Sequence, residues 1–262
     1  MQGAKAFSHR VAHKLRRVAA QMKLAAAGKL QSGFCPICER PVYFAKSGTW
    51  LRDQYFCPRC NSIPRFRAII RVLETHFPDW RNRTIHESSP HGASSDKIRK
   101  EAKNYIASQL FDDVPRGEMK NGQRSENLEQ LSFADGTFDL TITQDVFEHV
   151  LRPDRAFAEI ARTLKPGGAH VFTVPYYRGK RTVVRARAGS NDEIEHLLKP
   201  DYHSNPIDPR GALVVTEWGD ELCDFIFLAS GMTTTIFNFF DPRFGLEGEF
   251  LDVLISRKLH TA

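Results

Sequence analysis

The chain has 262 residues, of which 41% are hydrophobic and 26% charged, with a formal net charge of +6 and 5 cysteines. This length accommodates one α/β domain and a small module. No apolar run approaches the roughly 20 residues that a membrane span needs, and the basic N-terminus lacks the apolar core of a signal peptide. We therefore expect a cytoplasmic protein without a transmembrane segment, whose positive charge suits an anionic partner.

Residues 1–33 are predicted to form a basic amphipathic helix. The segment before Cys35 holds several Lys and Arg residues but no Asp or Glu. Its apolar residues recur at spacings of three and four, which is the helical period. They are Phe7, Val11, Leu15, Val18 and Met22. Such a helix docks on anionic lipid, as a peripheral membrane contact, or on nucleic acid. A solvated helix packed on its own domain, or a frayed terminus, explains the pattern equally well.

Two Cys-x2-Cys loops, separated by residues 39–56, predict a zinc ribbon at residues 34–62. Each loop turns two thiolates toward one point, so two loops complete a tetrahedral four-sulfur site. Its ligands are Cys35, Cys38, Cys57 and Cys60. Short strands are expected at 42–44 and 50–51, with a turn at 46–48. A closed site leaves no position for a catalytic water, so we assign the zinc a structural role. A redox dithiol pair is the alternative, but that chemistry needs only one such loop.

A linker helix is predicted at 63–80, between this ribbon and the final domain at 81–262. Its apolar residues, with Phe66 and Ile70 among them, lie on one face. Arg65, Arg67 and Arg71 are expected on the other face. That basic face is interpreted either as a substrate-recognition surface or as a solvated helix face.

The final domain begins with predicted strands at 84–88 and 104–111 and a helix at 95–102. Farther along, a strand at 138–143, a helix at 154–164 and a strand at 169–174 form a βαβ unit. Its strands are therefore parallel and buried. Ligands of such sheets bind beyond the carboxyl ends of the strands. That edge carries Gln144, Asp145, Glu148, His149, Pro175 and Tyr176.

Three motifs in this region carry a family resemblance. They are Phe133-x-Asp135-Gly136-x-Phe138-Asp139, Glu148-His149-Val150 and Leu164-Lys165-Pro166-Gly167-Gly168. Their order and spacing resemble the class I S-adenosylmethionine (SAM) dependent methyltransferases that act on small molecules. The resemblance covers about the last two thirds of the chain. It implies an α/β, Rossmann-like sheet whose final antiparallel strand is inserted between its neighbours, preceded here by the small zinc ribbon and the basic helix.

The resemblance also implies a SAM site. Family members have an acidic residue and then a glycine-rich loop after the first strand. This chain keeps Glu87 but has only Gly92, with small serines in place of the other glycines. Gln109, or alternatively Asp112 or Asp113, is expected near the ribose hydroxyls. The full set of implied cofactor residues is Glu87, Ser88, Ser89, Gly92, Gln109, Asn127, Gln144 and Asp145, with Asn127 near the adenine.

Transfer of a methyl group needs alignment and, for a hydroxyl or amine acceptor, a base. Histidine is the usual base near neutral pH. His149 lies at the expected sheet edge, and His196 and His203 lie in a polar insertion at 176–209. Insertions at this position commonly cover the acceptor in the superfamily. We therefore predict that His149, supported by Glu148, acts with His196 or His203 on the acceptor.

Three functions are consistent with these patterns. The first is O-methylation of a small-molecule or sugar-like (glycan) acceptor. The second is an RNA methyltransferase, favoured by the basic N-terminus and the Arg-rich helix. Tyr176, Tyr177 and Tyr202 could then stack on a flipped base. Residues 144–147 lack the Asn-Pro-Pro-Tyr signature of such enzymes, which favours a small molecule. The third is a non-catalytic binding module with a degenerate SAM site.

Overall fold

An eight-stranded sheet forms the centre of the computed structural model, which describes residues 26–189, 193–203 and 210–259. The strand order is β16-β17-β9-β8-β4-β5-β7-β6. In that order the strands are β16 (Thr233–Phe237), β17 (Val253–Arg257), β9 (Leu164–Thr173), β8 (Phe138–Gln144), β4 (Thr84–Ser88), β5 (Asn104–Gln109), β7 (Gln123–Ser125) and β6 (Met119–Lys120). The strands from β9 to β7 are parallel, and β17 runs antiparallel between β16 and β9. The predicted Rossmann-like sheet with an inserted final strand is therefore confirmed.

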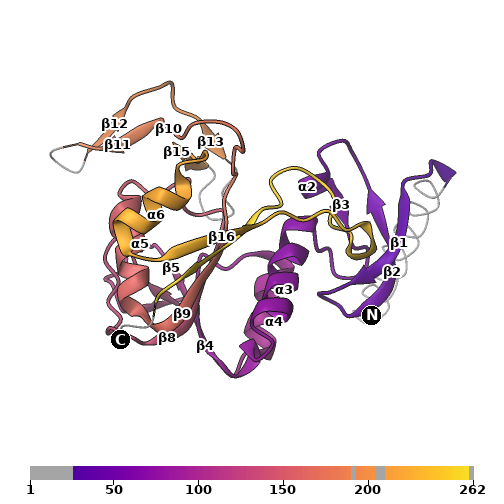
Figure 1. Ribbon diagram of the computed structural model, residues 1–262, viewed down its shortest axis with the longest axis horizontal. Coiled ribbons are helices and arrows are strands. Elements are labelled where there is room, and N and C mark those ends of the chain that lie inside the picture. Colours follow the sequence, from indigo (N-terminus) through magenta and orange to yellow (C-terminus); the bar gives the residue numbers. More distant parts are fainter. Residues whose placement is uncertain (1–25, 190–192, 204–209, 260–262) are drawn as a thin grey trace, which may run out of the picture.

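Helices cover both faces of this sheet (Figure 1). The helices α3 (Pro64–His76) and α4 (Gly92–Glu101) pack on one face, while α5 (Pro153–Thr163) and α6 (Leu222–Ser230) pack on the other. Neighbouring residues of one strand serve opposite faces, because side chains alternate along a strand. Val171 joins the cluster under α3, and Phe172 joins the cluster under α5. None of the described helices is long and apolar enough to cross a membrane.

Several predicted boundaries need correction. The helix predicted from residue 95 begins at Gly92, so Ser94 and Ser95 lie inside α4 rather than in an open loop. Strand β9 begins at Leu164, because the Lys-Pro-Gly-Gly segment continues into the strand after a register shift. Residues 1–25 of the predicted basic helix lie outside the described residues, and 30–33 belong to a strand.

The cysteine module, residues 30–62, is a small three-stranded sheet of β1 (Leu30–Cys35), β2 (Arg40–Lys46) and β3 (Tyr55–Phe56). The strand predicted at 50–51 is wrong, because Leu51 opens the short helix α2 (Leu51–Gln54). The module and the large sheet share one hydrophobic cluster, in which Phe44 and Tyr55 join α3 and the sheet residue Ile85. The module is therefore packed against the sheet domain through α3.

Arg67 of α3 is fully buried, which corrects its predicted place on a solvated basic face. Burial raises the cost of its charge, and this lowers the pKa of the guanidinium to about 10. The guanidinium donates hydrogen bonds to the backbone carbonyls of Ser62, Tyr55 (2.9 Å) and Gly245 (2.6 Å). It also lies 4.5 Å from the ring centre of Phe44. One side chain thus joins three separate segments of the chain.

Gly245 belongs to the long connection between β16 and β17, which contains the 3-10 helix η2 (Pro242–Phe244) and reaches the cysteine module (Figure 1). Its φ of +65° is in the left-handed region, and an added Cβ would lie 2.9 Å from the Arg67 guanidinium. Glycine is therefore required for this connection to approach Arg67. A second 3-10 helix, η1 (Trp80–Asn82), leads from α3 into β4.

The described part of the polar insertion between β9 and α6 contains three strand pairs. They pair β10 (Val183–Val184) with β15 (Thr216–Glu217), β11 (Ala186–Ala188) with β12 (Ile194–His196), and β13 (Tyr202–His203) with β14 (Ala212–Leu213). The insertion is anchored to the loop after β8, because the backbone N–H groups of Val215 and Thr216 donate to the carbonyl of Glu148 at 2.7 and 3.1 Å. Its described part therefore lies over the carboxyl edge of the sheet.

Replacing Arg67 with methionine should strongly destabilise the protein. The change removes the charged donor and leaves three buried carbonyls without it. Hydrogen bonds to charged groups contribute roughly 1.5–3 kcal/mol each, but the substitution also removes the cost of burying a charge, so we expect the free energy of unfolding to fall by about 3 kcal/mol. Urea denaturation of Arg67→Met and of the wild type measures this, with the exposed Arg155→Met on α5 as the control. Equal stability of Arg67→Met and the control would contradict the assigned role.

Candidate active site

The carboxyl ends of β4, β5 and β8 meet at one edge of the sheet. Ser88 of β4 pairs with Ser108 of β5 and Thr143 of β8, so their successors lie together at this edge. The structure thereby places Ser89, Gln109 and Gln144 along the same edge. This edge is where the bound ligand of such a sheet lies.

Glu87 is buried at the centre of this edge and has three hydrogen-bond donors. Its carboxylate accepts from the Ser95 hydroxyl (2.6 Å), the Tyr105 hydroxyl (2.7 Å) and the Gln144 amide (3.0 Å). Burial raises the pKa of Glu87, and the three donors oppose that rise. Glu87 and Gln144 therefore hold β4, α4 and β8 together beneath the edge.

Gly92 does not face open space. A Cβ built there would lie 2.3 Å from the ring of Phe66 on α3. The interpretation that the small residue at 92 makes room for a cofactor is therefore corrected: it makes room for Phe66. Sequence alone could not show this, because the partner comes from a helix that precedes the loop.

Asp145 carries the strongest ion pairing at the edge. Its carboxylate accepts from Arg52 of α2 (2.6 Å), from Arg65 of α3 and from the Thr173 hydroxyl (2.9 Å). Burial alone would raise the pKa of Asp145, but the two guanidinium groups outweigh it and lower the pKa to about 2. Asp145 is thus ionised and held by side chains of the cysteine module and of α3.

The far end of the edge is formed by the residues after β5 and β7. The carbonyl of Gln109 accepts from the N–H of Glu126 at 3.0 Å. The Asn127 side-chain oxygen accepts from the N–H of Glu129 at 2.9 Å, which fixes a local turn. Its amide nitrogen is left as a donor, so Asn127 keeps one polar group for a ligand.

Glu148, His149 and His203 form a cluster where the loop after β8 meets the insertion. One ligand-type atom of each residue lies within 4.8 Å of the others. His149 Nδ1 donates to the carbonyl of Leu213 at 2.8 Å, and its Nε2 lies 3.7 Å from Glu148 Oε1. The ring centres of His149 and His203 are 5.4 Å apart. Burial lowers the pKa of His149, so its imidazole is favoured in the neutral form.

His196 lies elsewhere in the insertion. It is an exposed residue of β12, and it is outside the three-residue cluster found among the described residues. The structure thus selects His203, and not His196, as the insertion histidine beside His149.

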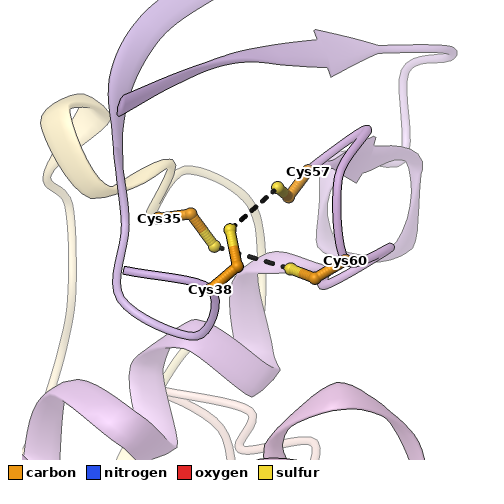
Figure 2. A group of neighbouring side chains, drawn as sticks. All are labelled: Cys35, Cys38, Cys57 and Cys60. Carbon is orange, nitrogen blue, oxygen red and sulfur yellow. Dashed lines mark hydrogen bonds between the residues drawn. The ribbon is translucent and has the colours of Figure 1, made fainter. Parts of the chain in front are cut away.

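The four cysteines of the module converge on one point (Figure 2). Cys35 and Cys60 have their Sγ atoms 3.6 Å apart, and those of Cys38 and Cys57 are 3.9 Å apart. A tetrahedral zinc site with Zn–S bonds of about 2.3 Å has sulfur atoms about 3.8 Å apart. The Ser62 hydroxyl lies 3.4 Å from Cys35 Sγ and 3.2 Å from Cys60 Sγ. All four are free cysteines, so their arrangement fits a tetrahedral metal ion.

Two arginines of this site were not predicted as site residues. The sequence placed Arg65 on the basic face of the linker helix but indicated no partner for it. No sequence pattern pointed to Arg52. Both reach Asp145 only because α2 and α3 pack against the carboxyl edge. Because these arginines lie 80 and 93 residues before Asp145 in the chain, the sequence does not indicate this contact.

Comparison with known proteins gives one family match. Residues 93–172 match the model of the methyltransferase domain family, a segment that begins in the first turn of α4. Among curated proteins, none matches the chain significantly.

Solved structures with a similar fold are distant in sequence. A SAM-dependent methyltransferase from Mesorhizobium loti is 14% identical, with 72% of this chain and 97% of that chain covered and a TM-score of 0.47. A 1,6-didemethyltoxoflavin-N1-methyltransferase from Burkholderia thailandensis is 16% identical, with coverages of 74% and 78% and a TM-score of 0.45. A methyltransferase of Haloferax volcanii, solved with the Trm112 activator, is 16% identical, with coverages of 76% and 91% and a TM-score of 0.47.

The family match and the strand order of the sheet both fit a methyltransferase domain. The matched segment contains β5, α5, β8 and most of β9, and β17 is inserted antiparallel beside β9 as the motifs implied. Residues 93–172 thus match a methyltransferase domain, and the sheet around them has the strand arrangement that the motifs implied.

Proposed function

We propose that the protein transfers a methyl group from SAM to a hydroxyl of a small-molecule or sugar-like acceptor. The observation that carries this proposal is the cluster of Glu148, His149 and His203 at the carboxyl edge, beneath the insertion. A neutral imidazole next to the place of the methyl donor suits a hydroxyl acceptor, whose proton must be removed. The insertion contributes His203 to the cluster and lies over the sheet edge, which suits an acceptor held between the two.

The charges at the edge fit the amino-acid part of SAM. That part carries one ammonium and one carboxylate, and the edge offers the Asp145 carboxylate and the guanidinium groups of Arg52 and Arg65. The SAM carboxylate would accept hydrogen bonds from a guanidinium group, and the SAM ammonium would donate to Asp145. Gln109 and Asn127 lie at the other end, where the ribose and adenine would be held. SAM supplies a methyl group on a positively charged sulfur, and the protein's task is to align the acceptor with it.

His149 is the proposed base. A carbonyl only accepts hydrogen bonds, so the contact with Leu213 places the proton on Nδ1 and leaves the Nε2 lone pair free. Nε2 can then orient the acceptor hydroxyl and take its proton as the oxygen attacks the methyl carbon. His203 flanks the same position, and together the two rings define where the hydroxyl sits.

The RNA alternative loses part of its support. Tyr176 is buried, and its hydroxyl donates to Asp220 at 2.9 Å, so it is no stacking platform for a flipped base. Arg67 is buried and Arg65 is paired with Asp145. These arginines therefore do not form the basic surface that an RNA substrate would need. The basic N-terminal segment, the other support for RNA binding, lies mostly outside the described residues.

We further propose that the cysteine module holds one structural zinc ion. The four sulfur atoms form a closed tetrahedral set, and Arg67 and the Ser62 hydroxyl lie near the thiolates. A zinc ion with four thiolates has a net negative charge, so a neighbouring guanidinium is favourable. Zinc in this position would fix the loops that place Arg52 and Arg65.

Purified protein should contain one zinc ion per chain. Cys57→Ser should lose the metal and unfold the cysteine module, because binding energy at such a site is folding energy. Metal analysis together with thermal unfolding measures both effects, and Cys223→Ser, outside the cluster, is the matched control. A zinc-free protein whose four thiols all react in native buffer would refute the zinc proposal.

SAM should bind with an affinity that depends on Asp145. In Asp145→Asn the charge match with Arg52 and Arg65 is lost, so the dissociation constant should rise about tenfold or more, equivalent to about 1.4 kcal/mol. Calorimetric titration with SAM measures this, with the exposed Asp135→Asn as the control. If the wild type binds neither SAM nor its demethylated product, the binding-module alternative is the better explanation.

His149→Ala and His203→Ala should each slow methyl transfer by ~10²–10³-fold while SAM affinity changes little, because a positioned base contributes about that factor. Labelled SAM, incubated with metabolite fractions and separately with total RNA, reports both turnover and acceptor class. Glu193→Gln, exposed in the same insertion, is the control. Full turnover in both histidine variants would leave alignment alone as the mechanism, and methylation of RNA would favour the second function.

A further inference from the structure

The carboxylate of Glu148 is buried without a hydrogen-bond donor. Its residue is 2% exposed, and neither carboxylate oxygen has a hydrogen-bond partner among the described residues. Removing a carboxylate from water without a partner is costly, so such a group either stays protonated or binds a cation. Asp145, three residues earlier, is fully paired with Arg52 and Arg65. Both arginines contact Asp145, and no described residue donates a hydrogen bond to Glu148.

Two histidines complete the surroundings of Glu148. The contact of His149 Nδ1 with the Leu213 carbonyl turns Nε2 toward Glu148 Oε1, 3.7 Å away. His203 brings a third ligand-type atom within 4.8 Å. A backbone carbonyl that accepts from the second ring nitrogen is the arrangement that holds metal-binding histidines in place.

We propose that Glu148, His149 and His203 bind a divalent transition-metal ion, separate from the zinc of the cysteine module. Two imidazoles and one carboxylate suit first-row divalent ions and leave coordination positions open. Ligand atoms about 2.1 Å from one ion lie about 3–4 Å apart. Glu148 and His149 already meet this spacing, and a small inward shift of the exposed His203 side chain completes it.

The site joins the insertion to the sheet edge. His203 and Leu213 belong to the paired strands β13 and β14, so one strand pair supplies both a ligand and the acceptor that orients His149. A metal ion would therefore fasten this strand pair over the edge. With the ion bound, His149 Nε2 is a ligand and no longer the base, and an open position would instead hold the acceptor oxygen and lower the pKa of its hydroxyl. This last point alone depends on the proposed function.

Metal binding is tested on the full-length protein with its zinc content measured, in the absence of SAM and acceptor. Co²⁺ is the probe, because its absorption spectrum distinguishes nitrogen and oxygen ligands from thiolates, and because thiolate sites prefer zinc over Co²⁺. We expect one Co²⁺ per chain with a spectrum free of thiolate bands. His203→Ala and Glu148→Gln should weaken binding at least tenfold. His196→Ala, a histidine of the same insertion outside the cluster, should bind like the wild type.

Absence of Co²⁺ uptake by the zinc-loaded wild type would overturn the proposal, as would equal affinity in wild type and His203→Ala. Because His203 is exposed, this variant should fold even if Glu148→Gln does not. The measurement also separates the two proposals. Co²⁺ binding without SAM binding would refute the proposed function and leave the metal site, whereas SAM binding without Co²⁺ binding would do the reverse.

Discussion

The buried guanidinium of Arg67 is the contact on which the arrangement of the whole molecule depends. It joins the cysteine module, helix α3 and the connection between β16 and β17 through three backbone carbonyls. A planar group with donors in fixed directions can satisfy three carbonyls from separate segments, which a lysine cannot do. The same guanidinium lies over the ring of Phe44, so its charge is stabilised by an aromatic face as well.

Because α3 is fixed in this way, the cysteine module shapes the chemistry of the sheet edge. Arg52 of α2 and Arg65 of α3 both reach Asp145, which follows β8. The module and the sheet share one hydrophobic cluster, so a change in the module would move these two charges. The proposed structural zinc would therefore fix the positions of Arg52 and Arg65 at the sheet edge without itself contacting that edge.

The two carboxylates of the loop after β8 differ in their partners and thus in their roles. Asp145 has two guanidinium groups and a hydroxyl, and its pKa is lowered to about 2. Glu148 is equally enclosed but has no such partner among the described residues, and burial raises its pKa. Asp145 is neutralised by the arginines, whereas Glu148 would be neutralised by a proton or by a bound cation.

The sequence by itself determined the sheet, the four-cysteine cluster and the edge at which the site lies. These depend on local patterns: the βαβ unit at 138–174 and the spacing of the Cys-x2-Cys loops. Only the tertiary structure decided that Arg67 is buried, that Phe66 faces Gly92, and that His203 rather than His196 meets His149. Some of these contacts join residues far apart in the chain. The others depend on which face of a helix packs inward. Packing between elements sets such contacts, whereas periodicity and spacing report only the elements themselves.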